Sequence, residues 1–268
     1  MSGPVSETEL PSSDGARGLA LVRAPGPLLD QGIVTHISRS PVDVDLALAQ
    51  HAGYVAALER HGWRPVEVSP ADEHPDAVFI EDTVVVVDDL AVLTHPGALE
   101  RRGEVAGTES AVAELGLTIA RIEAPGTLDG GDVLQVGLTV YVGLGGRTNA
   151  EGIAQLTRLL APRGRTVVTV PLLEVLHLKS ALTALPDGRL IGLPSLIEAA
   201  SLPAIVVPPE EEGAHVVPLG GATVLMSASA PRTAQLLTDE GLRPEVVEIG
   251  EFEKLEGCVT CLSVLISH

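Results

Sequence analysis

The chain has 268 residues, of which 45% are hydrophobic and only 2% aromatic, and it carries a formal net charge of −19. This length and hydrophobic content predict a folded protein with an aliphatic core, and the negative charge argues against binding to nucleic acid, which requires a basic surface. No apolar segment is long enough to cross a membrane, and the first residues lack the basic and apolar stretches of a signal peptide, so we expect a cytoplasmic protein.

The first part of the chain predicts a polar tail followed by a strand, a helix and a second strand. Residues 1–17 are rich in Ser, Gly, Pro and Glu without an apolar run, so we expect a disordered tail. Residues 19–22 are an apolar strand. Residues 41–61 carry apolar side chains on one helical face, and the strand at 65–68 follows.

From residue 82 onward the chain repeats a unit of strand, turn, strand, polar loop, helix and strand. The predicted strand pairs are 82–87 with 91–94, 132–136 with 140–142, and 181–185 with 190–192; a fourth unit begins near Gly221 with a strand at 222–226, and a fifth at 262–266. The predicted helices are 104–115, 149–160, 195–201 and 231–240, and the strands that follow the last three of them are 166–170, 205–207 and 245–249. A period of about 40 to 50 residues is typical of propeller-like arrays.

The fifth unit ends at its first strand, and strand 19–22 from the other end of the chain can complete it. We therefore predict an α/β fold, a five-bladed α/β propeller with pseudo-fivefold repeats whose last blade is closed by the N- and C-terminal segments. No linker divides residues 18–268, so we expect one domain.

Polar residues recur at one phase of this repeat, just before or at the first strand of a unit: Glu81 and Asp82, Asp129 and Asp132, His177, and Cys261. Equivalent positions of a closed radial array converge on its axis. We therefore expect a thiol, an imidazole and several carboxylates to meet in one pocket. A nucleophile, a base and an orienting carboxylate are the components of nucleophilic catalysis.

Cys261 is also open to other interpretations. A lone buried cysteine usually serves as a small hydrophobic residue. Cys258 and Cys261 have the Cys-x-x-Cys spacing of redox and zinc sites, but no active-site helix pattern follows, and a structural zinc site uses four ligands. The two cysteines are too few for a disulfide framework. The repeat phase favours a nucleophile.

The residues expected beside Cys261 can also be interpreted as purely structural. His177 lies among apolar residues, where a histidine is often a satisfied core group, yet its near-neutral pKa suits proton transfer. Asp129 begins an Asp-Gly turn, but its two glycines also allow close approach of backbone. Four arginines follow the second strands of their units, and arginine is the residue best suited to a ligand carboxylate: Arg101, Arg102, Arg147 and Arg232.

Several stretches of the chain, in order from about residue 18 to residue 266, resemble the dimethylarginine dimethylaminohydrolase (dimethylargininase) family. They are Phe79-Ile80-Glu81-Asp82, His95-Pro96-Gly97-Ala98, Arg101-Arg102-Gly103-Glu104, Thr127-Leu128-Asp129-Gly130-Gly131-Asp132-Val133-Leu134, Arg147-Thr148-Asn149, His177-Leu178-Lys179 and Thr260-Cys261-Leu262-Ser263. The family belongs to the guanidine-modifying superfamily, and this resemblance implies a five-bladed α/β propeller, in agreement with the repeat.

The resemblance implies a hydrolase that converts methylated arginine into citrulline and an amine through a covalent intermediate, without a metal or organic cofactor. It implies that Cys261 is the nucleophile, His177 the acid and base, and Asp129 the third member of the triad. Cys258 has no counterpart in the family pattern, so we assign it no catalytic role.

The resemblance also implies a set of substrate contacts. The acidic positions are Asp76, Glu81 and Asp82, Phe79 forms a wall, and Arg101 and Arg147 receive the carboxylate of the substrate. Ile33 stands where the family has a leucine in a loop over the site, and Leu255 offers a backbone carbonyl. The implied partner is a small molecule, with neither nucleic acid nor membrane, and the oligomeric state is left open.

Three alternatives remain at this point. Arginine deiminase and agmatine deiminase share related catalytic groups, but the former is longer by a helical insertion that is not present here, and agmatine lacks a carboxylate for the two arginines. A non-enzymatic propeller that binds a ligand would contain an inert Cys261.

Overall fold

The computed structural model describes residues 17–267, so the predicted tail lies outside the described residues except for Arg17. The described strands form five sheets of three strands each. Their bounds are β1 Gly18–Val22, β2 Trp63–Glu67, β3 Val84–Val87, β4 Leu90–Leu93, β5 Thr118–Arg121, β6 Val133–Val136, β7 Thr139–Leu144, β8 Thr166–Pro171, β9 Leu182–Ala184, β10 Leu190–Gly192, β11 Ile205–Val206, β12 Val216–Gly220, β13 Thr223–Ser227, β14 Arg243–Val247 and β15 Val264–Ser267.

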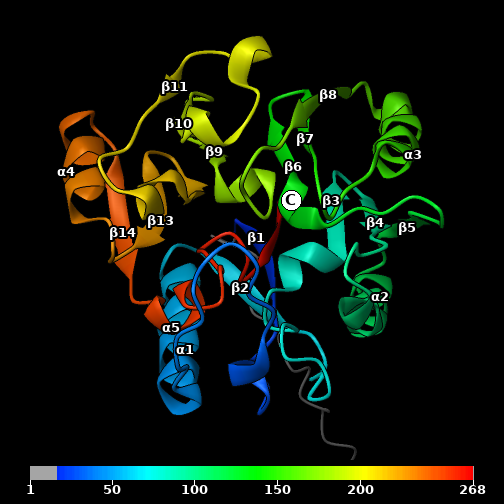
Figure 1. Cartoon of the computed structure of the whole chain (residues 1–268), viewed down its shortest axis with the longest axis horizontal. Helices are drawn as coiled ribbons and strands as arrows, with labels where there is room; N and C mark the ends of the chain where they lie inside the picture. Colours follow the sequence, from blue (N-terminus) through cyan, green and yellow to red (C-terminus); the bar gives the residue numbers. More distant parts are fainter. Residues whose placement is uncertain (1–16, 268) are drawn as a thin grey trace, which may run out of the picture.

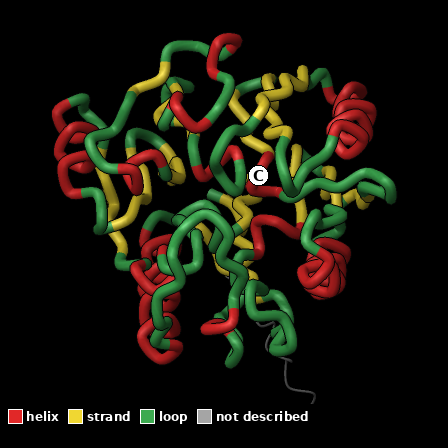
Figure 2. Tube along the Cα trace, viewed as in Figure 1, coloured by secondary structure: helices red, strands yellow, loops and turns green. Residues whose placement is uncertain are grey.

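Every sheet repeats one topology. Its first strand is antiparallel to the second, and the second is parallel to the third. A parallel pair needs a crossover connection, and in four sheets a helix supplies it: α1 Val44–Arg60, α2 Val105–Glu114, α3 Ala150–Leu160 and α4 Pro231–Asp239. Figures 1 and 2 show these helices on the outer side of the sheets.

Local sequence explains where the helices begin and end. The Asp43 carboxylate accepts a hydrogen bond from the N–H of Leu46 at 3.0 Å and caps α1. Gly62 follows α1 with a φ of 83°, a left-handed conformation that favours glycine. Asn149 caps α3 by accepting from the N–H of Gly152 at 2.8 Å, as its position in the sequence predicts.

The two ends of the chain share one sheet, in which β1 lies between β15 and β2. Leu21 pairs with Val264 on one side and with Val66 on the other. This pairing confirms the prediction that the amino-terminal strand completes the last unit, and Figure 1 shows β15, in red, near the centre of the molecule.

Two sequence predictions differ from the structure. The fourth unit starts at β12 rather than near Gly221, so the strand expected at 222–226 is the second strand of its sheet, β13. The helix expected at 195–201 is replaced by two single 3₁₀ turns, Pro194–Leu196 and Ala199–Ser201. Because Pro194 and Pro203 leave little room for a regular helix, the third unit has the shortest crossover.

Tight turns precede the first strands and position the polar residues of the repeat. The 3₁₀ turns η2 Ile80–Thr83, η4 Gly130–Asp132 and η6 Leu178–Ser180 lead into β3, β6 and β9. Turn η2 packs against η4, and η4 packs against η6. The short helix α5 Gly250–Glu253 and the turn after it lead into β15 in the same way. Within residues 17–267, no helix has the length and apolar character needed to span a membrane.

Candidate active site

Cys261 lies in the turn between α5 and β15. Its N–H donates to the carbonyl of Cys258 at 3.1 Å and closes the turn. The hydroxyl of Tyr54, from the buried face of α1, donates to the carbonyl of Val259 at 2.8 Å and shares a hydrogen bond with Ser263 at 2.8 Å. These contacts fix the turn from behind. The Cys261 side chain lies at the edge of a pocket, and the residue is 9% exposed.

His177 directly precedes η6 and lies among carboxylates. Its Nε2 is 3.0 Å from Oδ2 of Asp129, and its Nδ1 is 3.9 Å from Oδ1 of Asp82. The neighbouring carboxylate of Asp132 accepts from the N–H of Leu178 at 2.9 Å and holds the backbone beside the histidine. Burial lowers the pKa of His177, but the three carboxylates outweigh burial and raise it to about 9. The imidazole is therefore protonated at neutral pH.

Two glycines let the segment from Asp129 to Asp132 approach the other turns. A side chain at Gly130 would place its Cβ 1.9 Å from the carbonyl oxygen of Glu81, and one at Gly131 would lie 2.7 Å from Nδ1 of His177. The N–H of Gly131 donates to Asp82 at 2.8 Å. The Asp-Gly-Gly-Asp segment thus brings a backbone donor to Asp82 and the Asp129 carboxylate to the histidine, where larger residues would collide.

Arg101 is buried, and its guanidinium is surrounded by acceptors. It forms ion pairs with Asp82 and, at 2.7 Å, with Glu104, and it donates to the carbonyls of Asp76 at 3.2 Å and Phe79 at 3.0 Å. Burial raises the pKa of Asp82, but His177 and Arg101 outweigh burial, so that its pKa is well below the usual range. Asp82 is therefore ionised, and most of the Arg101 donors are engaged by the protein.

Arg147 is freer than Arg101. Its guanidinium is 3.6 Å from Oδ2 of Asp129, and its side chain is 13% exposed. It lies at the same pocket as Cys261. Among the described residues, Arg147 is therefore better placed than Arg101 to offer hydrogen bonds to an incoming carboxylate.

The structure brings nine of the sequence-predicted site residues to one pocket, which we call the cysteine pocket: Ile33, Asp76, Phe79, Asp82, Arg101, Arg147, His177, Leu255 and Cys261. Asp129 lies fully buried behind His177. Burial raises the pKa of Asp76, and its carboxylate accepts from the N–H of Ile33 at 3.1 Å. Phe79 packs edge-on against Phe252, with ring centroids 6.3 Å apart.

The cysteine pocket is small, with a free volume of about 20 Å³. Ile33 lines it, and Glu256, which also lines it, holds the loop that follows Ile33. The Glu256 carboxylate accepts from the N–H of Thr35 and of Ile37, each at 2.9 Å, and also from the N–H of His36. A space of this size holds about one water molecule, so side chains that line the pocket must shift to admit a larger ligand.

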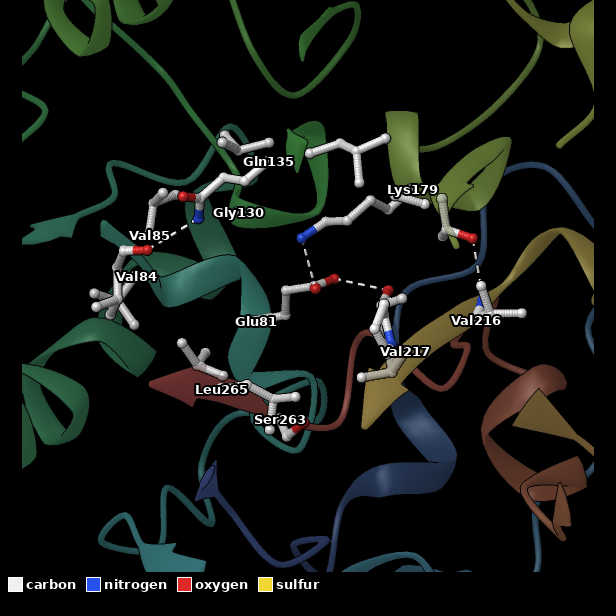
Figure 3. Close-up of a pocket in the computed structure, with 18 residues that line it drawn as sticks. Glu81, Val84, Val85, Gly130, Gln135, Lys179, Val216, Val217, Ser263 and Leu265 are labelled. Carbon is white, nitrogen blue, oxygen red and sulfur yellow. Dashed lines mark hydrogen bonds and ion pairs between the residues drawn. The ribbon is translucent and has the colours of Figure 1, made fainter. Parts of the chain in front are cut away.

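Glu81 lies in a second cavity, which we call the lysine cavity. Its carboxylate accepts from Nζ of Lys179 at 2.6 Å and from the hydroxyl of Thr260 at 3.0 Å. Figure 3 shows the Lys179 amine and the Glu81 carboxylate pointing toward each other between aliphatic walls. Burial raises the pKa of Glu81 to about 7. A contact of Glu81 with substrate stays a prediction, because this carboxylate does not line the cysteine pocket.

Sequence reasoning gave no site role to four residues that shape these two cavities. Glu104 pairs with Arg101, Lys179 pairs with Glu81, and Glu256 fastens the loop after Ile33. Cys258 lies with its Sγ 3.4 Å from Sγ of Cys261. Three of them carry a sequence signal: Cys258 lies in the Cys-x-x-Cys spacing, and Glu104 and Lys179 lie in the stretches that resemble the family.

The carboxylates and the histidine could in principle hold a metal ion. One oxygen of Asp82, one of Asp129 and one ring nitrogen of His177 lie within 4.8 Å of one another. However, Arg101 and the protonated imidazole already balance the charge of these carboxylates. We therefore keep a metal-free site as the prediction.

The fold and the site together define an enzyme of the guanidine-modifying superfamily. No protein-family model matches the chain. N(G),N(G)-dimethylarginine dimethylaminohydrolase of Streptomyces coelicolor is 59% identical to it over 246 residues, which cover 91% of this chain and 95% of the relative. The protein of the same name from Pseudomonas aeruginosa is 34% identical over 248 residues, covering 91% and 97%. The chain therefore belongs to the dimethylarginine dimethylaminohydrolase family.

Solved structures agree with this assignment. A cysteine-to-serine mutant of the Pseudomonas aeruginosa enzyme complexed with citrulline matches with a TM-score of 0.86 and 34% identity, covering 94% of this chain and 100% of that chain. The N-terminal domain of the cyanobacterial arginine dihydrolase ArgZ matches with a TM-score of 0.81 at 19% identity, covering 93% and 98%, which is a likeness of fold alone.

Proposed function

We propose that the chain hydrolyses N-omega-methylated arginines, with dimethylarginine giving citrulline and dimethylamine. The observation that carries this proposal is the cysteine pocket, where Cys261, the protonated His177 and the buried carboxylates lie together. A guanidinium is a planar cation with several donors, so the carboxylates of Asp76 and Asp82 are suited to bind it. The 59% identical relative of the same family supports the substrate class.

The first half of the reaction forms a covalent intermediate. Sγ of Cys261, as the thiolate, attacks the guanidinium carbon and gives a tetrahedral adduct. The bond from carbon to dimethylamine then breaks while His177 gives its proton to the departing nitrogen. A thiouronium remains on Cys261. The hydrogen bond that Nε2 of His177 donates to Asp129 keeps the ring in place and favours its protonated form.

The second half releases citrulline. The neutral His177 takes a proton from water, which attacks the same carbon. The carbon–sulfur bond then breaks and returns Cys261 as the thiolate. We further propose that Arg147 binds the carboxylate of the amino acid and that Arg101 holds Asp82 in its ionised form, since Arg101 is already engaged by Asp82 and Glu104. The carbonyl of Leu255 and the loop at Ile33 complete the contacts.

The five sheets are proposed to form a closed propeller of five blades, within one catalytic domain that spans residues 18–268. Packing between neighbouring sheets supports this arrangement, because β15 packs against β3, β6 against β9, and β9 against β12. A closed array would place the turns before the first strands around one axis, where the proposed chemistry takes place.

Product analysis tests the proposed function directly. The protein is incubated separately with dimethylarginine, monomethylarginine, arginine and agmatine, and citrulline and released amines are measured. We expect citrulline with dimethylamine from the first substrate. Ammonia release from arginine or agmatine, with dimethylarginine untouched, would instead indicate a deiminase. An inert Cys261 that a thiol-selective alkylating reagent leaves unmodified, with no turnover, would indicate a ligand-binding protein.

A further inference from the structure

Cys258 is a buried nucleophilic group that the proposed reaction does not use. Its Sγ lies 3.4 Å from Sγ of Cys261 and 3.3 Å from the hydroxyl of Thr260, and its N–H points to Sγ of Cys261 at 3.4 Å. The residue is 3% exposed, whereas Cys261 lines the cysteine pocket. A second thiol thus lies directly behind the proposed nucleophile.

We propose that Cys258 is a resolving cysteine, which converts an oxidised Cys261 into a reversible Cys258–Cys261 disulfide. This inference rests on the proposed function in one respect, because it takes Cys261 to be the reactive thiol of the pocket. The site is an oxidative modification site, and the co-reactant is a peroxide small enough to enter the cysteine pocket.

The turn that carries both residues suits such a bond. The hydrogen bond from the N–H of Cys261 to the carbonyl of Cys258 makes them the first and last residues of a four-residue turn. A turn of this kind keeps its end Cα atoms within about 7 Å, and disulfides join Cα atoms about 4.4–6.8 Å apart. The two sulfurs already touch, so small changes in side-chain torsion and turn geometry bring them to bonding distance.

The chemistry balances with one peroxide molecule. The Cys261 thiolate attacks one peroxide oxygen, the O–O bond breaks, and Cys261 becomes a sulfenic acid while hydroxide leaves. The Cys258 thiolate then attacks Sγ of Cys261, the S–S bond forms, the S–O bond breaks, and a second hydroxide leaves. The two hydroxides take up the two thiol protons as water. The sulfurs together lose two electrons, which the peroxide gains.

The ionisation of the pair bears on the first step. The hydrogen bond shared by the sulfurs lowers the pKa of Cys258 well below its usual range and raises that of Cys261, because the Cys261 thiol is then the donor and the Cys258 thiolate the acceptor. Moving the shared proton to Cys258 gives the other form of the same anion, with the thiolate at the pocket. The reduced pair can therefore supply the Cys261 thiolate that the first step requires.

The disulfide would have two consequences. It removes the Cys261 thiolate, so hydrolysis stops while the bond persists. It also protects the sulfur, because a sulfenic acid that meets no second thiol is oxidised further to sulfinic acid, which a thiol reductant does not reverse.

The test exposes the full-length wild type and the Cys258→Ser variant to hydrogen peroxide over a prolonged time course, followed by dithiothreitol. Intact mass, alkylation by iodoacetamide and activity are measured at each stage. We expect the oxidised wild type to lose the mass of two hydrogens, to resist alkylation at both cysteines, and to recover its activity after reduction. We expect Cys258→Ser to gain the mass of oxygen atoms on Cys261 and to remain inactive after reduction.

Other outcomes overturn the proposal. One is a wild type that accumulates sulfinic acid on Cys261 without forming the disulfide, and another is a Cys258→Ser variant that recovers as fully as the wild type. Cys258→Ala provides a second variant if the serine disturbs folding, and thermal melting checks both. The mass and alkylation readouts do not depend on which substrate is hydrolysed, so failure of the disulfide is distinguishable from failure of the proposed function.

Discussion

The cysteine pocket and the lysine cavity are built from neighbouring residues of the same turns, yet they differ in character. Residues of η2, the turn before β15 and the start of η6 divide between them: Asp82, Cys261 and His177 line the cysteine pocket, whereas Glu81, Thr260 and Lys179 line the lysine cavity. The first is small and crowded with charged groups. The second is larger, with a volume of about 250 Å³, and its walls are mainly aliphatic.

We propose that this difference separates chemistry from stability, in which case Glu81 would not contact the substrate. In the cysteine pocket, a raised pKa on His177 and an ionised Asp82 keep opposite charges beside a thiol. In the lysine cavity, one amine and one carboxylate satisfy each other, and no thiol is exposed to them. We therefore expect substitutions in the cysteine pocket to change rates and substitutions in the lysine cavity to change the free energy of unfolding.

After loss of the nucleophile itself, the largest expected effect on the rate is that of His177→Ala. Loss of the acid and base should reduce kcat by roughly 10² to 10⁴-fold, the usual contribution of proton transfer, with little change in substrate binding. Steady-state kinetics measure the loss, and His61→Ala, at a partly exposed histidine that pairs with Glu245, is the matched control. An unchanged kcat would remove His177 from the chemical steps.

The same histidine predicts how pH acts. The folded-state pKa of about 9 lies above the unperturbed value of 6.5, so protonated His177 stabilises the fold fully below pH 6.5, and this contribution is lost as the pH rises through 9. Since amine release needs the imidazolium, kcat should fall over the same alkaline range.

The largest expected effect on stability is that of Lys179→Met. It leaves the buried Glu81 carboxyl without its partner amine. Because burial raises the pKa of Glu81 to about 7 even beside the amine, the carboxyl then takes up a proton, and the expected loss is that of one charge-assisted hydrogen bond, about 1.5–3 kcal/mol. Denaturant unfolding measures this loss, and adding Glu81→Gln should recover part of it. The comparison of the two cavities fails if Lys179→Met abolishes turnover while leaving the unfolding midpoint in place.

Arg147→Met should have an intermediate effect that depends on the substrate. One charge-assisted hydrogen bond contributes about 1.5–3 kcal/mol, so kcat/KM for methylated arginine should fall by roughly 10 to 150-fold. A substrate whose carboxylate is replaced by hydrogen should be poor with the wild type and lose little more with the variant.

The four combinations of enzyme and substrate form a cycle that isolates this contact. Arg102 donates to the carbonyl of Pro96, and Arg102→Met is the control. It should change kcat/KM equally little for both substrates. Equal losses of kcat/KM with both substrates would show that Arg147 does not bind the carboxylate of the substrate. A wild-type preference for the decarboxylated substrate would favour agmatine deiminase.

The smallest expected effect is that of Glu256→Gln. The amide keeps an acceptor for the loop N–H groups but loses the charge that strengthens those bonds, so KM should rise by roughly 2- to 5-fold while kcat holds. Steady-state kinetics provide the check, with Glu59→Gln, at an exposed acid of α1, as control. A lower kcat with unchanged KM would contradict a role in holding the loop.

Much of this arrangement could be predicted from the repeat. The phase of polar residues indicated that Cys261, His177 and a carboxylate would meet, because equivalent turns of the five units face the same way. The start of the fourth unit was wrong because Pro218 interrupts the pattern of its first strand, β12. Proline lacks the backbone N–H and is tolerated in a sheet only where that donor is not needed. The sequence of β12 therefore does not look like that of a typical strand.

The contacts of Glu256, Lys179 and Cys258 could not be predicted in this way. Glu256 bonds to a loop more than 200 residues away in the chain, and Lys179 meets Glu81 across two units. Packing in three dimensions decides in which direction each side chain of these turns points. A repeat places backbone segments together but does not say which of two neighbouring residues faces which cavity.

The most direct measurement of the central claim is to trap the intermediate on the nucleophile. The protein is mixed with excess dimethylarginine, quenched in acid during turnover, and its peptides are mapped by mass spectrometry, with Cys261→Ser and Cys258→Ser treated in parallel. We predict a substrate-derived mass on Cys261 in the wild type and in Cys258→Ser, and Cys258→Ser should also keep turnover. Cys261→Ser should show neither the adduct nor turnover, because a serine hydroxyl is a much weaker nucleophile. An adduct on Cys258, or wild-type turnover by Cys261→Ser, would contradict the account.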